Sequence, residues 1–331
     1  MVKNITKKYA ERNEVIRNRG ILVLVNSILL KIQKIYFPFK VIGKPQSIQI
    51  EISTKCNLKC VMCPLTSQEK KEKYLPHLLK PKNMGFEEFR KILDSFPRAG
   101  IIRINGIGEP LLNPEIEKMI AYCTENGILS VFNTNGTMLT EEKSRGLIES
   151  GASSVIISFD GANKKTFESI RIGANYDKVL ENISSLVKLK KELKSELPKI
   201  SIATVYMKQN REELEKIREM FRKIGVNDFI TNNLNGPPND EFSMKNRVIE
   251  PEKNAPISCV QPWDEVYINI NGQISPCCYA PYLNFGNIFE QDFDSTWNNS
   301  KYEQFRKNKR SRKSDICNNC PAYSVKKPGF F

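Results

Sequence analysis

Ser47-Ile-Gln-Ile-Glu-Ile-Ser-Thr54 is followed, one residue later, by Cys56-Asn-Leu-Lys-Cys60-Val-Met-Cys63. The first run is rich in β-branched residues and predicts a β-strand. The second places three thiols on one short loop after that strand, and three thiolates can hold three irons of a cubane cluster while the fourth iron stays open. The alternatives are a zinc knuckle or buried thiols. Zinc needs a fourth ligand, however, and His77 is the only further Cys or His before Cys123.

Strand-like and helical stretches alternate from residue 47 to residue 235, and glycines stand where three of the helices should end. This alternation implies parallel strands joined by right-handed crossovers. Six units are too few for a closed eight-stranded barrel, so we expect an α/β fold with an open, partial (β/α)6 barrel and a site at the strand C-termini. The expected strands are Ser47–Thr54, Ile101–Ile107, Leu129–Asn133, Ser154–Phe159, Ile200–Tyr206 and Asp228–Asn233, and the expected helices are Gly85–Phe96, Pro114–Asn126, Thr140–Ser150, Asn175–Leu193 and Arg211–Ile224.

The C-terminal part is predicted to be a small, cysteine-rich α+β extension. Asn271-Gly272, between the strand-like runs Glu265–Ile270 and Gln273–Pro276, predicts a hairpin with a type I′ turn. A helix over Asp292–Lys309 should follow. The extension holds five of the nine cysteines and is too small to be stable through a core of its own. We therefore divide the chain into a basic helical segment (1–45), a barrel (46–235) and the extension (236–331).

The composition is that of a folded globular protein, with 331 residues of which 40% are hydrophobic and 27% charged. No run approaches the roughly 20 apolar residues of a membrane span, and no signal peptide is visible. We therefore expect a cytoplasmic, reducing compartment, where grouped thiols more often hold metal than form disulfides. The single histidine excludes His-rich metal sites and, unless it serves alone, His-dependent nucleophilic catalysis.

The cysteine loop closely resembles the signature of the radical S-adenosylmethionine (SAM) superfamily, whose members carry it after the first strand of a partial (β/α)6 barrel. Three further segments resemble family motifs at the ends of the next three strands. These are Gly106-Ile-Gly108-Glu109-Pro110, Asn133-Thr-Asn135-Gly136 and Ser158-Phe-Asp160-Gly161. Ile107 departs mildly from the usual Gly-Gly-Glu-Pro pattern, and Thr166–Arg171 is also similar to the family. The resemblance covers about residues 47–235.

The resemblance implies a [4Fe–4S] cluster on Cys56, Cys60 and Cys63, with SAM chelating the open iron. It also implies that the segment from Gly106 to Pro110 binds the amino group of SAM and that Met62 lies against the adenine. The remaining cofactor-binding residues that it implies are Gly108, Glu109, Asn135, Ser158, Asp160 and Arg171; for the last three, an exposed turn with a helix N-cap is the alternative. The reduced cluster would cleave SAM to a 5′-deoxyadenosyl radical that takes a hydrogen atom from the substrate, and an external one-electron reductant such as flavodoxin or ferredoxin is implied.

A second cysteine pattern, C-x12-G-x4-C…C-x2-C, resembles the twitch extension, a shortened form of the SPASM extension. The resemblance implies one auxiliary [4Fe–4S] cluster, and so two clusters in all, on Cys259, Cys277, Cys317 and Cys320. Such a saturated cluster binds no SAM but can relay an electron. Structural zinc on four cysteines also fits the spacing. Cys278 is an alternative ligand to Cys277, although the distance to Gly272 favours Cys277.

Three functions from different classes are compatible with the sequence. The first is radical SAM oxidation of a polar, sugar- or cyclitol-like small molecule, which is the chemistry of the clearest twitch relatives. The second is a peptide-modifying maturase of the SPASM type, although no strand before the barrel could pair with a peptide. The third is a zinc protein that binds RNA through a net charge of +14. No RNA-binding motif appears, so we expect no nucleic-acid partner.

Other features are predicted to be structural. A lone loop histidine such as His77 is usually solvated, and the basic run Arg306–Lys313 is predicted to be a solvated helix end. Cys123 should lie in the core. For the basic N-terminal helix over Ile21–Phe37 we favour packing of its apolar face against the bottom of the barrel, the alternative being peripheral contact with an anionic membrane.

Overall fold

A single curved sheet of nine strands organises the part of the chain that the structure describes. The computed structural model describes residues 20–36, 39–226, 228–234, 240–249, 259–311, 313–318 and 320. The strand order is β6-β5-β4-β3-β2-β1-β7-β8-β9, and β1 to β6 are parallel neighbours in chain order. Their bounds are β1 (Ser47–Ile50), β2 (Ile101–Ile104), β3 (Leu129–Thr134), β4 (Ser154–Ser158), β5 (Lys199–Tyr206) and β6 (Asp228–Asn233). Because β6 and β9 are the free edges, the barrel is open, as predicted.

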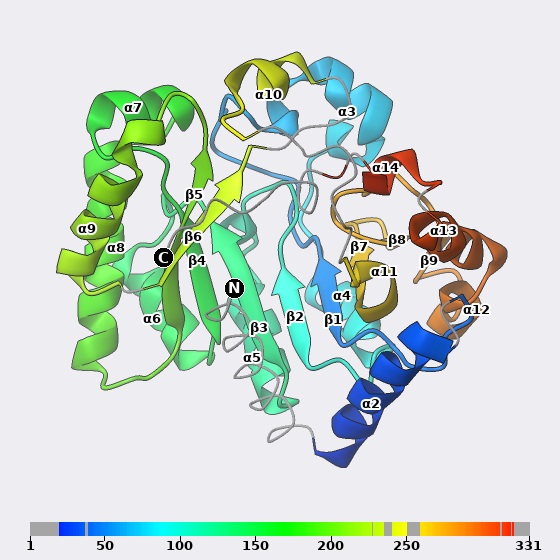
Figure 1. Ribbon diagram of the computed structural model, residues 1–331. Coiled ribbons are helices and arrows are strands. Elements are labelled where there is room, and N and C mark those ends of the chain that lie inside the picture. Colours follow the sequence, from blue (N-terminus) through cyan, green and yellow to red (C-terminus); the bar gives the residue numbers. More distant parts are fainter. Residues whose placement is uncertain are drawn as a thin grey trace.

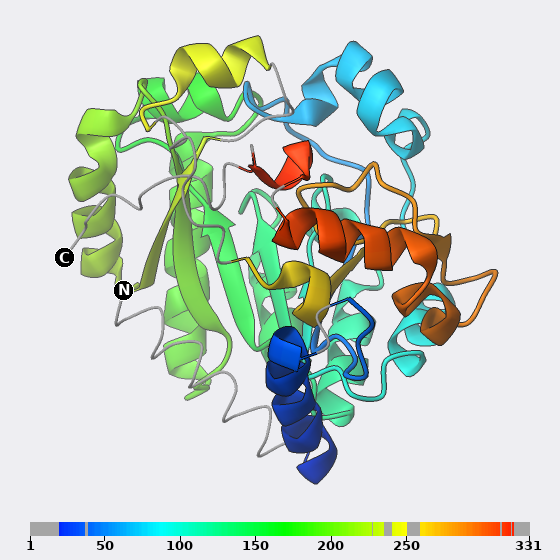
Figure 2. The ribbon, with the colours of Figure 1, turned by 45° about the vertical axis from the view of Figure 1, so that its right-hand side comes forward.

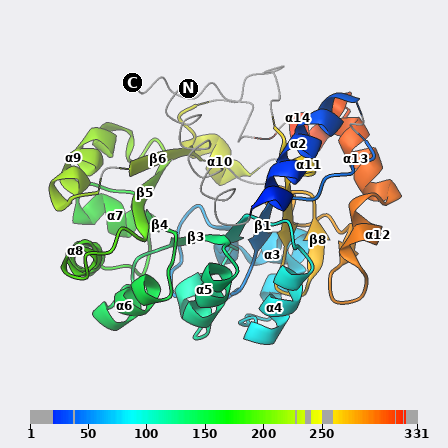
Figure 3. The same cartoon turned by 90° about the horizontal axis from the view of Figure 1, so that it is seen from below.

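The helices that connect the parallel strands lie on the outer side of this sheet (Figure 3). They are α4 (Phe86–Asp94), α5 (Ile116–Glu125), α6 (Glu141–Glu149), α8 (Tyr176–Glu192) and α9 (Leu214–Ile224). Their apolar side chains share one core with the strands, as Phe89 and Met119 do with Ile48. Gly225 ends α9 in the left-handed conformation, with φ of 105°, which confirms its predicted role as a helix stop. The short helix α7 (Lys164–Ile170), inside the motif that ends at Arg171, was not predicted.

The two faces of the sheet differ in chemistry. Ile48 and Ile50 of β1 are fully buried against the outer helices. Side chains alternate along a strand, so Gln49 points to the inner face. The strand register aligns Gln49 with Arg103 of β2 and Tyr267 of β7, which share that face. The inside of the open barrel is therefore polar at this level, in contrast to the packed apolar interior of a closed barrel.

The cysteine-rich extension continues the barrel sheet. Its first strand, β7 (Glu265–Ile268), pairs in parallel with β1, and β8 (Gln273–Ser275) and β9 (Gly286–Asn287) follow as antiparallel strands. The predicted type I′ turn is wrong, because Gly272 has a positive φ and Asn271 does not. Instead Gly272 N donates to Asn269 O at 2.9 Å. The shared sheet explains how so small an extension can be held in place.

The predicted helix over Asp292–Lys309 is interrupted. Helix α12 (Phe293–Trp297) ends at Asn298, and Asn299 caps a new helix, α13 (Ser300–Arg310), by accepting a hydrogen bond from Tyr302 N at 3.0 Å. Two shorter helices, α11 (Gln261–Asp264) and α14 (Asp315–Asn318), complete the extension. Figure 1 shows α13 and α14 beside β8 and β9.

One helix of the N-terminal segment is described, α2 (Ile21–Tyr36), while the predicted helical stretch from Ala10 to Arg19 lies outside the described residues. Val23 packs on Ile101 and Leu129, which begin β2 and β3, so α2 does cover the bottom of the barrel. Helices α3 (Gln68–Tyr74) and α10 (Glu241–Asn246) lie at the opposite end, toward which the parallel strands run (Figure 1). None of the described helices is both long and apolar enough to cross a membrane.

Candidate active site

The first cysteine loop is held against the end of α7. Lys59 N donates to Ile172 O at 2.8 Å and Val61 N donates to Ile170 O at 3.1 Å. The backbone of the loop is therefore hydrogen-bonded to the segment that follows β4. Burial raises the pKa of all three thiols, and that of Cys63 rises to about 11. Negative charge on Cys56 and Cys60 raises the pKa of Cys63 further. The three sulfurs are therefore neighbours in a partly desolvated site.

A buried ion pair between Asp160 and Arg171 lies beside this loop. Asp160, which is fully buried, accepts from Arg171 Nε at 2.6 Å and from Val205 N at 2.6 Å. The same guanidinium points its Nη1 at Cys60 Sγ, 3.8 Å away. Burial would lower the pKa of Arg171, but the charges of Asp160 and Cys60 raise it overall. A permanent cation thus faces Cys60, and it favours the thiolate that iron binding needs.

The Gly106–Pro110 segment crosses the end of β1 in close contact. A Cβ on Gly108 would lie 2.3 Å from Ser53 O, and one on Gly106 would lie 2.3 Å from Glu51 Cγ. Glu109 N donates to Lys55 O at 2.7 Å, which ties this segment to the residue that precedes Cys56. Gly108 is therefore required by the approach of two backbones and Gly106 by the Glu51 side chain packed against it, independently of any cofactor.

Glu109 and Asn135 link the next strand end to the cysteine loop. The buried Glu109 carboxylate accepts from Thr134 Oγ1 and from Asn135 N, each at 2.7 Å, and burial raises its pKa. Asn135 Nδ2 in turn donates to Asn57 Oδ1 at 2.9 Å, one residue after Cys56. These side chains hold the loops together around the site.

The residues that the sequence predicts to bind SAM lie at one end of the sheet, and they differ in how far their side chains are buried. Asp160 and Glu109 direct their carboxylates into the protein. Met62 packs on Ile170 and Met207. Ser158 ends β4 on the inner face and is half-buried. Gly106 is exposed, so its backbone is open to a ligand.

Sequence reasoning missed a polar cluster beside this site. Glu51 is fully buried just after β1, and its carboxylate accepts from Ile107 N at 3.0 Å and Ile270 N at 3.3 Å. His77 Nε2 lies 3.1 Å from Glu51 Oε2, and the His77 side chain is only 7% exposed, so its predicted solvation is wrong. Burial and the charge of Glu51 raise the pKa of Tyr267 well above its usual range. The signal in the sequence was an acidic residue at an inward position of a strand.

The C-terminal cysteines also form one group. Charge on Cys317 raises the pKa of Cys259, and charge on Cys278, Cys259 and Cys320 raises that of Cys277, so the thiols are neighbours. Burial is the main cause of each shift. The structure brings both Cys277 and Cys278 near Cys320, and Cys278 lies additionally beside Glu265 and Arg103 of the inner face.

The basic run Arg306–Lys313 is only in part the predicted solvated helix end, because Lys307, Arg310 and Lys313 are exposed while Arg306 and Lys309 are buried. Arg306 is fully buried, lies over the rings of Trp297 and Tyr302, and donates from Nε to Pro262 O at 3.0 Å. Lys309 is buried too; its Nζ lies over the Trp263 ring and donates to Cys259 O. Both cationic side chains therefore stabilise the extension through buried contacts.

Both thiol groups have the donor chemistry of an iron–sulfur cubane, whose irons bind thiolates. Each thiolate of a cubane binds a different iron, so its sulfurs stand around the cluster and need no common point. The first group supplies three thiols and the second supplies at least four.

Comparison with known proteins gives two family matches. Residues 50–239 match the family described as the Radical SAM superfamily, and residues 259–321 match SPASM, an iron–sulfur cluster-binding domain.

Among curated relatives, the tungsten-containing aldehyde ferredoxin oxidoreductase cofactor-modifying protein of Pyrococcus furiosus is 31% identical over 56% of this chain and 51% of its own, so the chain spans about half of that relative. The AdoMet-dependent heme synthase of Methanosarcina barkeri is 26% identical over 80% of this chain and 84% of that protein. The S-adenosyl-L-methionine-dependent 2-deoxy-scyllo-inosamine dehydrogenase of Niallia circulans is 25% identical over 84% of this chain and 93% of that protein.

Solved structures share the fold. BtrN in complex with AdoMet and 2-DOIA aligns with a TM-score of 0.50 and 20% identity, over 84% of this chain and 93% of BtrN. SuiB of Streptococcus suis bound to precursor peptide SuiA aligns with a TM-score of 0.63 and 17% identity, over 88% of this chain and 74% of SuiB. At these identities the likeness concerns the fold.

Proposed function

Because the chain belongs to the radical SAM superfamily, we propose that it oxidises an alcohol group on a polar, sugar- or cyclitol-like small molecule. As a member it is an enzyme that uses SAM and iron–sulfur chemistry. Our finer proposal is that Cys56, Cys60 and Cys63 hold the SAM-binding cluster and that Cys259, Cys317, Cys320 and Cys277, or Cys278 in its place, hold an auxiliary cluster. When bound, these groups would supply a 5′-deoxyadenosyl radical as hydrogen-atom acceptor and a second centre as electron acceptor.

The observation that carries this proposal is the polar inner face of the barrel. Gln49, Arg103 and Asn105 are half-buried there, and Asn133 is exposed beside them. Gln49 Nε2 donates to Asn105 O at 3.0 Å, and Asn133 N donates to Asn105 Oδ1 at 2.6 Å, so the lining is preorganised. A ring with several hydroxyl or amino groups can match such alternating donors and acceptors. The dehydrogenase of Niallia circulans, whose name denotes such a substrate, resembles this chain over most of both lengths.

Oxidation of a carbinol removes one hydrogen atom, one proton and one electron. We propose that His77 accepts the proton, since its imidazole Nε2 stands 3.1 Å from the buried Glu51 carboxylate, which can stabilise the imidazolium. Glu51 also fixes Ile107 N, so this dyad is adjacent to the segment assigned to SAM. Arg171 and Asp160 position the cysteine loop and do not touch the substrate in this proposal. Flavodoxin or ferredoxin would supply the initial electron.

The test separates oxidation from hydrogen abstraction alone. Anaerobic enzyme is incubated with SAM, reductant and an aminocyclitol, and product is compared with 5′-deoxyadenosine. In Cys317→Ala/Cys320→Ala, hydrogen abstraction continues without an electron acceptor, so the ratio of product to 5′-deoxyadenosine should fall while circular dichroism shows a folded protein. An unchanged ratio would mean that the second cysteine group only holds the extension together.

Three competing functions give other results in the same assay. A peptide maturase, the class suggested by the likeness to SuiB, would be inert toward cyclitols and active on a peptide encoded beside its gene. An enzyme of heme synthesis, the class of the Methanosarcina barkeri relative, would turn over a tetrapyrrole. A zinc-containing RNA-binding protein would hold no iron and would release no 5′-deoxyadenosine.

A further inference from the structure

Helix α2 presents its aliphatic side chains outward. Leu24, Val25, Ile28 and Ile32 are 37–47% exposed, and Tyr36 is 70% exposed. We call these five side chains the α2 apolar stripe. A helix of a globular protein normally turns such a stripe toward the core. Packing of the apolar face on the barrel, as the sequence favoured, is thus only partly right. Val23 and Leu30 are buried, but most of the aliphatic side chains of α2 that the structure describes are not.

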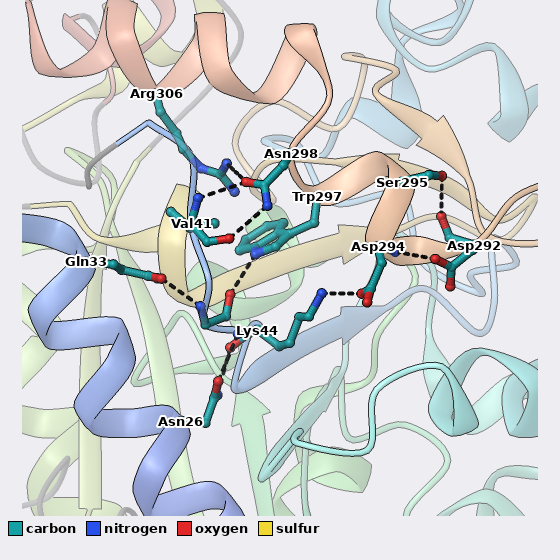
Figure 4. Close-up of polar contacts among 11 residues, drawn as sticks. Asn26, Gln33, Val41, Lys44, Asp292, Asp294, Ser295, Trp297, Asn298 and Arg306 are labelled. Carbon is teal, nitrogen blue, oxygen red and sulfur yellow. Dashed lines mark hydrogen bonds and ion pairs between the residues drawn. The ribbon is translucent and has the colours of Figure 1, made fainter. Parts of the chain in front are cut away.

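The buried face of α2 is largely polar. Asn26, Ser27 and Gln33 are at most 4% exposed. Asn26 Nδ2 donates to Lys44 O and Asn26 Oδ1 accepts from Lys44 N, each at 2.9 Å. Gln33 Oε1 accepts from Gly43 N at 2.7 Å. Figure 4 shows Asn26 and Gln33 reaching from α2 to the linker that precedes β1, in which Val41, Gly43 and Lys44 lie. The polar residues therefore face inward because they satisfy the backbone of that linker.

Residues of the C-terminal extension also hydrogen-bond the linker, and the position of the linker fixes the rotation of α2 about its axis. Trp297 Nε1 donates to Gly43 O at 2.8 Å, and Asn298 exchanges two hydrogen bonds with the backbone of Val41, at 2.9 and 2.8 Å (Figure 4). Rolling α2 to bury its stripe would break the Asn26 and Gln33 bonds and leave buried amides without partners. The stripe therefore stays outward in the folded protein.

The basic charge of the N-terminal segment indicates which kind of surface the α2 apolar stripe binds. Residues 1–19 contain six Lys or Arg and two Asp or Glu, and no acidic residue occurs between Glu14 and Glu51. Lys31 and Lys40, on and after α2, are exposed. An apolar stripe within a stretch that is basic by sequence is the pattern of an interfacial helix that binds anionic lipid. The described helix has 16 residues, fewer than the roughly 20 of a membrane span, and its length therefore fits a position along the surface.

We propose that α2 docks this protein on an anionic lipid surface, with the α2 apolar stripe inserted among the headgroups. Figures 1 and 2 place α2 at the lower end of the molecule, opposite the end where α3 and α10 lie and toward which the parallel strands run. A docked protein therefore turns its candidate active site away from the lipid. The substrate would enter from the aqueous side, which agrees with a polar inner face.

The test is flotation of the full chain with lipid vesicles. It should float with vesicles of phosphatidylcholine and phosphatidylglycerol, should not float with phosphatidylcholine alone, and should be released by salt. Ile28→Glu/Ile32→Glu should weaken binding by about tenfold or more, since it places charge in the inserted stripe. Leu193→Glu, which changes an equally exposed leucine at the end of α8, should bind as the wild type does.

Three results of the flotation assay would overturn the proposal. They are absence of flotation with anionic vesicles, equal binding by Ile28→Glu/Ile32→Glu, or equal binding to neutral and anionic vesicles. Size-exclusion chromatography with light scattering tests the competing occupant. If the wild type is a dimer and Ile28→Glu/Ile32→Glu a folded monomer, the stripe is an interface between two copies of this chain and the lipid proposal fails.

Discussion

Replacing Asp160 by Asn tests whether this carboxylate serves the fold or the cofactor. It is fully buried and accepts two hydrogen bonds, of which the one from Arg171 Nε is 2.6 Å long. Asp160→Asn removes the negative charge and leaves a guanidinium that is 12% exposed without its main partner. Breaking a buried ion pair from one side costs about 3–5 kcal/mol of folding free energy. Urea unfolding of the metal-free protein, followed by circular dichroism, should show a loss of this size.

A matched control is Asp177→Asn. Asp177 pairs with Lys164 at 3.3 Å, but their side chains are 70% and 58% exposed. An exposed pair contributes about 0–1 kcal/mol, so this variant should be close to wild type in stability. The reasoning is refuted if Asp160→Asn is no more destabilising than Asp177→Asn. Weaker SAM binding at unchanged stability would mean that Asp160 contacts the cofactor, as the family resemblance implies.

Three further predictions concern the loops and the clusters. Gly108→Ala should lower the free energy of unfolding by about 1–3 kcal/mol and weaken SAM binding, because its methyl would lie 2.3 Å from Ser53 O. The control Gly85→Ala, whose methyl would have no contact under 3.7 Å, should cost less. Calorimetry of both variants with SAM would check this. In metal-free protein, alkylation of Cys63, whose pKa burial raises to about 11, should be slow at neutral pH and increase with pH up to that value, because only the thiolate reacts. Fast labelling of Cys63 at pH 7, seen by peptide mass spectrometry, would contradict its burial. Reconstituted protein should hold about eight iron and eight sulfide, and replacing Cys56, Cys60 and Cys63 by Ala should leave about half.

The barrel and its strand-end motifs could be predicted from the sequence because their signals are local. The strand before Cys56 and the glycine stop at Gly225 each depend on a few adjacent residues. Contacts distant in sequence could not be predicted in this way. Arg306 is buried because Trp297 and Tyr302 lie beside it, which requires the break of the predicted helix at Asn298.

The outward stripe of α2 and the burial of His77 have the same origin. The orientation of α2 depends on the linker, which Trp297 clamps from 254 positions away. His77 is buried by Glu51 across an insertion whose path no periodicity reveals. In both cases a polar side chain is buried because it satisfies a distant partner, and hydrophobic patterning predicts the opposite.

The most direct test of the account is the release of 5′-deoxyadenosine under anaerobic conditions with SAM and a strong reductant. The wild type should release it slowly even without substrate. Cys60→Ala should release none, because our proposal makes Cys60, which faces Arg171, a ligand of the cluster that binds SAM. Cys123→Ala, which changes a fully buried core thiol, should retain the activity. Continued release by a folded Cys60→Ala variant would contradict the assignment of the first cysteine loop and the mechanism built on it.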